Sequence, residues 1–130
     1  MLAFTGLANA RRLMGKTSLK RLAMISEADW KHFKTVQAAT LDKFCKQILD
    51  DASETINDVV LSNHEKYISL YRMIEKRDKR IAEIFNYNSR SKVMLQLYLL
   101  KSEGLLEAVQ IAGFSTEVQE YLTNNDLYVR

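Results

Sequence analysis

The most apolar stretch of the chain lies at residues 93–100, where seven of the eight side chains are apolar. A surface helix carries a single apolar stripe, whereas here apolar side chains surround nearly the whole helix axis. Gly104 suits the left-handed position just past a last helical turn, and Ser89 or Ser91 can cap the first turn. The run is shorter than the roughly 20 apolar residues that span a bilayer. We therefore expect a buried central helix over about residues 90–103, covered by other helices.

A long amphipathic helix is predicted before it, opening at Ser26 as N-cap with Asp29 in a capping-box relation. Apolar residues recur every three or four positions, apart from a polar break at Gln37. The helix would be about 45 Å long if unbroken. Residues 50–53 are the place where a break or bend is most expected, because Asp and Ser compete for backbone hydrogen bonds. The expected core-facing positions of this helix are Trp30, Phe33, Leu41, Phe44, Ile48, Ala52, Ile56 and Val59.

A second long helix should begin near Asn63, because Ser62 and Glu65 have capping-box spacing. A charged run at residues 75–80 interrupts its apolar face and marks either a solvated part of one helix or a junction between two; we favour one helix. Residues 86–89 are rich in turn formers and end it. The expected apolar face comprises Tyr67, Leu70, Tyr71, Ile74, Ile81, Ile84 and Phe85.

Two more helices are expected after the central one, the first reaching about Ala112 and the second starting at Ser115 and ending at residues 123–126. The chain of 130 residues has no proline and four glycines, so the usual punctuation of hairpins and long loops is nearly absent. These patterns predict an all-α fold, an irregular bundle of about four to six helices around the central helix.

Charge separates the N-terminal segment from the rest of the chain. Residues 1–26 contain no acid, although the whole chain has 16, and they carry Arg11, Arg12, Lys16, Lys20 and Arg21. A basic arm docked on its own domain, a retained mitochondrial-type targeting leader and a nucleic-acid-binding arm all fit this composition. We therefore divide the chain into a basic arm or leader at 1–25 and one helical domain at 26–130.

Candidate chemistry is sparse. His32 and His64 are the only histidines, and neither follows a glutamate at the spacing of a helical di-metal site. Cys45 is the only cysteine and lies in the apolar pattern of the first long helix, where most cysteines are inert. We predict no enzymatic activity, catalytic residue, metal, cofactor, small-molecule substrate or membrane span. The lone cysteine indicates an intracellular, reducing compartment, the cytoplasm or, given the basic leader, the mitochondrial matrix.

Residues 78–107 resemble two known families. The pattern of Ile81, Ala82, Phe85, Asn86, Tyr87 and Ser89, followed by Val93, Leu97, Leu100, Gly104, Leu105, Leu106 and Glu107, is similar to the helix-turn-helix of LexA-type SOS repressors. That resemblance implies that Ser89 to Lys92 face the DNA major groove. Tyr87, Arg90, Ser91 and the Glu103-Gly104-Leu105 end of the central helix are similar to the helical fluorescence recovery protein family, whose members act by protein contact.

Two functions compete on these observations. We expect foremost an accessory subunit or small regulator that contacts a protein partner or its own copies, because the aromatic and two-sided apolar surface exceeds what a small bundle hides. The expected interface residues are Met94, Leu95, Tyr98, Leu99, Tyr67 and Tyr71. Either the long helix from Trp30 covers the second face of the central helix, or a partner does. The alternative is nucleic-acid binding through Arg11, Arg12, Lys16, Lys20, Arg21, Ser89, Arg90 and Lys92.

Overall fold

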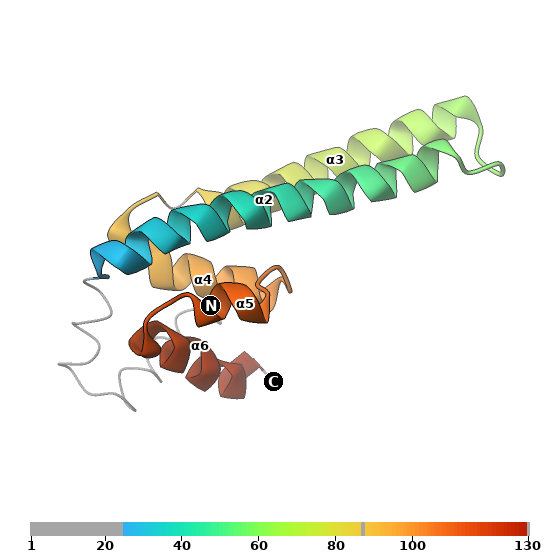
Figure 1. Cartoon of the computed structure of the whole chain (residues 1–130). Coiled ribbons are helices and arrows are strands. Elements are labelled where there is room, and N and C mark those ends of the chain that lie inside the picture. The colour runs from blue at the N-terminus through green and yellow to red at the C-terminus, as the bar shows by residue number, and fades with distance from the viewer. Residues whose placement is uncertain (1–24, 87, 130) are drawn as a thin grey trace.

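The two longest helices, α2 (Glu27–Ile56) and α3 (Asn63–Phe85), run antiparallel as a hairpin (Figure 1). Three shorter helices lie together beside one end of this hairpin, the end where α2 begins and α3 finishes (Figure 1). They are α4 (Val93–Ser102), α5 (Ala108–Ala112) and α6 (Thr116–Val129), with a 3-10 turn at Arg90–Lys92 leading into α4. The computed structural model describes residues 25–86 and 88–129, with the side chains of 25–86 and 88–124. Within these ranges it is all-helical, which confirms the predicted fold class.

Helix α2 is an unbroken helix of 30 residues, so the helix does not break at residues 50–53, where the sequence most favoured a break or bend. The acids there are engaged by side chains instead of the backbone: Asp50 accepts from Lys46 at 2.8 Å and Asp51 from Arg77 at 2.6 Å. Ser26 caps the helix as predicted, its hydroxyl accepting from the Asp29 amide at 3.1 Å. The Asp29 carboxylate does not complete a capping box.

Helix α3 begins where the sequence predicts, with the Ser62 hydroxyl accepting from the Glu65 amide at 3.1 Å. It continues as one helix through the charged run at 75–80, which confirms the reading we favoured. Ile84 and Phe85 at its end are buried. The charged run therefore does not divide the helix; it lies where the cover provided by the shorter helices ends.

Helix α4 contains the densest part of the core, and it packs against α2, α3 and α6. Neither Ser89 nor Ser91 caps it, because the chain enters through the 3-10 turn and Lys92 occupies the N-cap position. Its end is a Schellman turn with Gly104 at a left-handed φ of 74°, as predicted. The Leu105 amide donates to the Leu100 carbonyl at 3.0 Å, which turns the chain sharply towards α5.

Two polar pairs lock α2 to the shorter helices. The buried Asp29 carboxylate accepts from the Ser115 amide at 2.9 Å and from its hydroxyl at 2.7 Å, which fixes the start of α6. Gln37, the polar break in the apolar pattern, donates at 2.7 Å to Gln96, which is fully buried in α4. These contacts join residues far apart in sequence, so they specify one arrangement of the helices.

Helix α5 ends at Ala112, as predicted, but it is a single short turn that begins only at Ala108. Helix α6 runs past residues 123–126, where the sequence predicted its end, and continues to Val129. His32 holds α5 against α2, because its Nε2 donates to the Gln110 carbonyl at 2.8 Å and its ring meets Phe114 edge-on at 4.4 Å. Gly113 lies directly against this imidazole, and a Cβ there would clash with it.

None of the described helices is both long and apolar enough to cross a membrane.

Candidate protein-contact surface

The exposed large apolar side chains gather on the part of the hairpin that extends beyond the shorter helices (Figure 1). We call residues 45–83 the outer hairpin, and the remaining described residues the base. Five of these side chains form what we call the apolar stripe: Leu49, Ile56, Tyr67, Tyr71 and Ile74. Val59 and Val60 lie in the loop at the tip and are almost fully exposed. In the described part of the base, only Val109 has comparable exposure.

Helical geometry places the apolar stripe on one side of the hairpin. Each of its residues directly follows a partly buried residue: Leu49 after Ile48, Ile56 after Thr55, Tyr67 after Lys66, Tyr71 after Leu70, and Ile74 after Met73. One residue is a rotation of about 100° in the same sense around each helix axis. Because the two helices are antiparallel, the residue that follows an inward-facing residue lies on the same side of the hairpin in both helices. The stripe therefore combines side chains of α2 and α3 on one surface.

The outer hairpin has almost no core of its own. From Cys45 to Glu83 every side chain is at least partly exposed, whereas buried side chains recur throughout the base. A helix in a protein draws most of its stability from packing an apolar face, and helices without such packing are marginal in water. The outer hairpin is therefore the part of the described chain whose helices have the fewest buried contacts and the most apolar surface left over.

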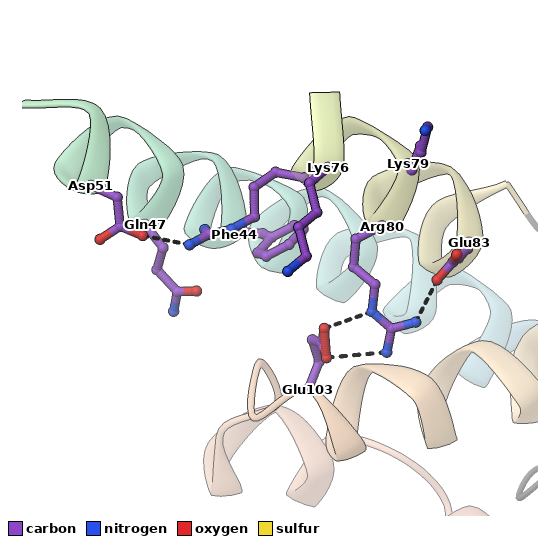
Figure 2. A pocket seen from close by; sticks show the side chains of 9 residues that line it. Phe44, Gln47, Asp51, Lys76, Lys79, Arg80, Glu83 and Glu103 are labelled. Carbon is purple, nitrogen blue, oxygen red and sulfur yellow. Dashed lines mark hydrogen bonds and ion pairs between the residues drawn. The ribbon is translucent and has the colours of Figure 1, made fainter. Parts of the chain in front are cut away.

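The opposite side of the hairpin carries a charged groove of about 860 Å³ between α2, α3 and the end of α4 (Figure 2). Arg80 lies between two acids there: it donates to Glu103 at 2.7 and 3.2 Å, a bidentate pair, and to Glu83 at 2.7 Å. The groove is lined by Phe44, Gln47, Asp51, Lys76, Arg77, Lys79, Arg80, Glu83 and Glu103. Because Glu103 belongs to the base, the groove is on the base side, and the apolar stripe faces away from the base.

The pairing in the groove shifts the pKa of both partners. The hydrogen bonds to Glu103, and then those to Glu83, raise the pKa of Arg80 above its ordinary value. The same bonds from Arg80 lower the pKa of Glu103, against a smaller opposing effect of partial burial. Both groups are therefore charged at neutral pH, and the pair works as a clamp between the outer hairpin and the base.

The histidines and the cysteine considered for chemistry do not lie together. His32 packs against α5, Cys45 is partly exposed on α2 and His64 is exposed at the start of α3. Among the residues that the structure describes, no group of three histidine, cysteine or acidic side chains could hold a metal ion.

The six predicted interface residues fall into two groups. Met94 and Tyr98 on α4 are buried, Tyr98 to 6% exposure, while Leu95 and Leu99 are partly buried. Tyr67 and Tyr71 are 59% and 62% exposed and belong to the apolar stripe. Of the two alternatives for the second face of α4, the structure thus favours cover within the chain.

The predicted nucleic-acid contacts are only partly described. Arg11, Arg12, Lys16, Lys20 and Arg21 lie outside the described residues. Ser89 and Lys92 are exposed at the start of the 3-10 turn and at its end. Arg90 is already engaged: it pairs with Glu27 and its guanidinium lies 5.4 Å from the Trp30 ring centroid. Nucleic-acid binding stays a prediction of the sequence.

Sequence reasoning assigned Ile56, Val59 and Ile74 to apolar faces of the core and did not single out Leu49 or Val60. Periodicity identifies which residues share a face, but it does not show whether another element is long enough to cover that face. A usable signal was the length of the elements: α2 and α3 have 30 and 23 residues, while α4 has 10. At about 1.5 Å per residue, helices of these lengths cannot be covered from end to end by α4.

Comparisons of the chain with protein-family models, with curated proteins and with solved structures each found no match. The resemblances to LexA-type repressors and to the fluorescence recovery protein family therefore stay predictions.

Proposed function

We propose that this chain is a non-enzymatic helical protein that acts by binding another protein chain through the apolar stripe. One observation carries the proposal: the outer hairpin has no fully buried residue from 45 to 83, yet it carries all but one of the strongly exposed large apolar side chains that the structure describes. Contiguous exposed apolar surface, with tyrosines among it, is what protein interfaces use.

The charged groove is the weaker candidate for this contact. Its acids already have partners, Arg77 for Asp51 and Arg80 for Glu83 and Glu103. A ligand would have to break these pairs or approach a solvated surface. The apolar stripe, in contrast, gains free energy simply by leaving water, at about 25 cal/mol for each Å² covered.

The shape of the molecule supports an adaptor-like role for the outer hairpin. The base fixes the orientation of α2 and α3 through Asp29, Gln37 and the Arg80 clamp. The hairpin extends beyond the base (Figure 1), and the exposed residues of the stripe lie on this extension. An accessory subunit or a small regulator needs such a rigid support for its contact surface.

Site-specific photo-crosslinking in cells tests the proposal. A photoreactive amino acid replaces Tyr71 in one variant, and Val109, which is 74% exposed in the base, in a matched control. We expect discrete crosslinked products from position 71 that are missing from position 109, whether the captured chain is another protein or a second copy. Equal products at both positions, or none at position 71, would contradict a contact role for the stripe.

A further inference from the structure

We infer that the chain that covers the apolar stripe is a second copy of this protein, so that two hairpins pack face to face as four helices. The inference rests on the proposed contact function and adds the identity of the partner. Three observations support it: the area of the exposed apolar surface, the charges around it, and the position of the base.

The area matches what a stable dimer requires. The apolar stripe holds five strongly exposed large apolar side chains. At about 100 Å² each, they offer roughly 500 Å² of apolar area. This is close to the apolar share, somewhat more than half, of the ~800 Å² that each partner contributes to a stable protein interface. A symmetric contact presents the same patch from both copies, so the whole stripe would be covered at once.

An ion pair borders the stripe on α2, where Lys46 donates to Asp50 at 2.8 Å, so the two charges there cancel. A border with surplus charge would repel its own copy, whereas this pair adds no net charge. A nucleic acid or an anionic membrane surface would instead favour an excess of Lys and Arg along the border.

The position of the base leaves room for the second hairpin. The charged groove and the base lie on one side of α2 and α3 (Figures 1 and 2), and the helical positions of the stripe residues place the stripe on the other side. Two hairpins can therefore approach through their stripes with both bases outside the contact. Tyr67 and Tyr71 suit such a contact, because a tyrosine ring can be buried while its hydroxyl reaches water or a polar partner. Four helices packed in this way are a common bundle architecture.

Sedimentation velocity of the purified full chain over a concentration series tests the inference. We expect a species of twice the 15.0 kDa monomer mass that dissociates on dilution. Tyr71→Asp places a charge in the stripe and should leave a monomer, with an apparent Kd at least about 100-fold weaker, corresponding to the loss of about 2.7 kcal/mol. Val109→Asp is the matched control and should keep the wild-type Kd.

The fold of each variant is checked by circular dichroism, and Ile56→Asp on the other helix serves as a second stripe variant. A wild-type chain that stays monomeric at every concentration, or a Tyr71→Asp chain and an Ile56→Asp chain that dimerise as the wild type does, would overturn the inference. Its failure is distinguishable from failure of the proposed function. A monomeric protein that still crosslinks to a different protein from position 71 retains the contact function and loses only the second copy.

Discussion

The base and the outer hairpin are built from the same two helices but differ in what covers them. In the base, α2 and α3 meet α4, and Asp29 and Gln37 join α2 to the shorter helices. In the outer hairpin the same helices pack chiefly against each other. The contacts with the base that the structure describes lie at the inner end of the outer hairpin, where Arg80 pairs with Glu103 and Ile48 and Ile81 touch the core. The difference teaches that helix formation and helix cover are separate properties of a sequence. Paired substitutions, one in each region, measure how strongly the two regions differ in their contribution to stability.

The largest contrast is expected between Tyr98→Asp and Tyr71→Asp. Tyr98 is 6% exposed, so a carboxylate there would be buried without a partner and should cost at least about 4 kcal/mol, enough to unfold the chain. Tyr71 is 62% exposed, and the same change should leave a folded helical chain. Circular dichroism and thermal melting of both variants measure this. A folded Tyr98→Asp would mean that α4 is covered less well than the structure indicates.

Two leucines give a smaller contrast without introducing charge. Leu97 is fully buried, and Leu97→Ala should lower the free energy of unfolding by about 2–5 kcal/mol through lost burial and a remaining cavity. Leu49 is 68% exposed, and Leu49→Ala should change it by less than about 0.5 kcal/mol in protein dilute enough to be monomeric. Urea unfolding followed by circular dichroism gives both values. Equal losses would show hidden packing in the outer hairpin.

Two aspartates compare the polar contacts of the regions. Asp29→Ala leaves the Ser115 amide and hydroxyl without their acceptor at a buried position and should cost about 1.5–3 kcal/mol. Asp50→Ala breaks the exposed pair with Lys46 and should change stability far less, because exposed ion pairs contribute little. The same urea series checks both. If Asp29→Ala were as mild as Asp50→Ala, the Asp29 contact would not hold α6 in place.

The smallest effect is expected at the clamp between the two regions, and it depends on pH. Glu103 has a lowered pKa in the folded chain, so its contribution is present above the unfolded pKa of about 4.3 and disappears as pH falls through the lower folded value. Glu103→Gln should thus lower stability by about 1 kcal/mol or less at neutral pH, and the difference should vanish in acid. Glu75→Gln, in an exposed pair, is the control and should change stability little, because exposed ion pairs contribute little. Melting temperatures of the wild type and of Glu103→Gln across a pH series measure this effect. A difference between the two that stays constant with pH would argue against the Arg80 pair as its source.

The local features of the fold could be predicted from the sequence. Ser26 and Ser62 cap helices, and Gly104 ends one, because each acts on a backbone group a few residues away. Contacts such as Asp29 with Ser115 could not be predicted, since nothing in the neighbourhood of either residue indicates the other. For the same reason, some of the predicted interface residues are exposed and others are buried. Tyr71 and Tyr98 are both aromatic residues on apolar helix faces, and only the arrangement of distant helices decides which one is covered.

The bond between Asp29 and Ser115 also affects the order of events during synthesis. It joins positions 86 residues apart, whereas α2 and α3 are complete once residue 85 has been made. Helix α2 is complete at Ile56, 59 residues before Ser115, so at about 5–20 residues per second it exists for roughly 3–12 s before Ser115 is added to the chain. During that time α6 is not yet in place. Phe33 and Val36, which become buried in the base, are then exposed to water as the apolar stripe is. A nascent chain thus presents apolar surface at both ends of its hairpin, and only the end formed by the start of α2 and the end of α3 is later covered by the shorter helices.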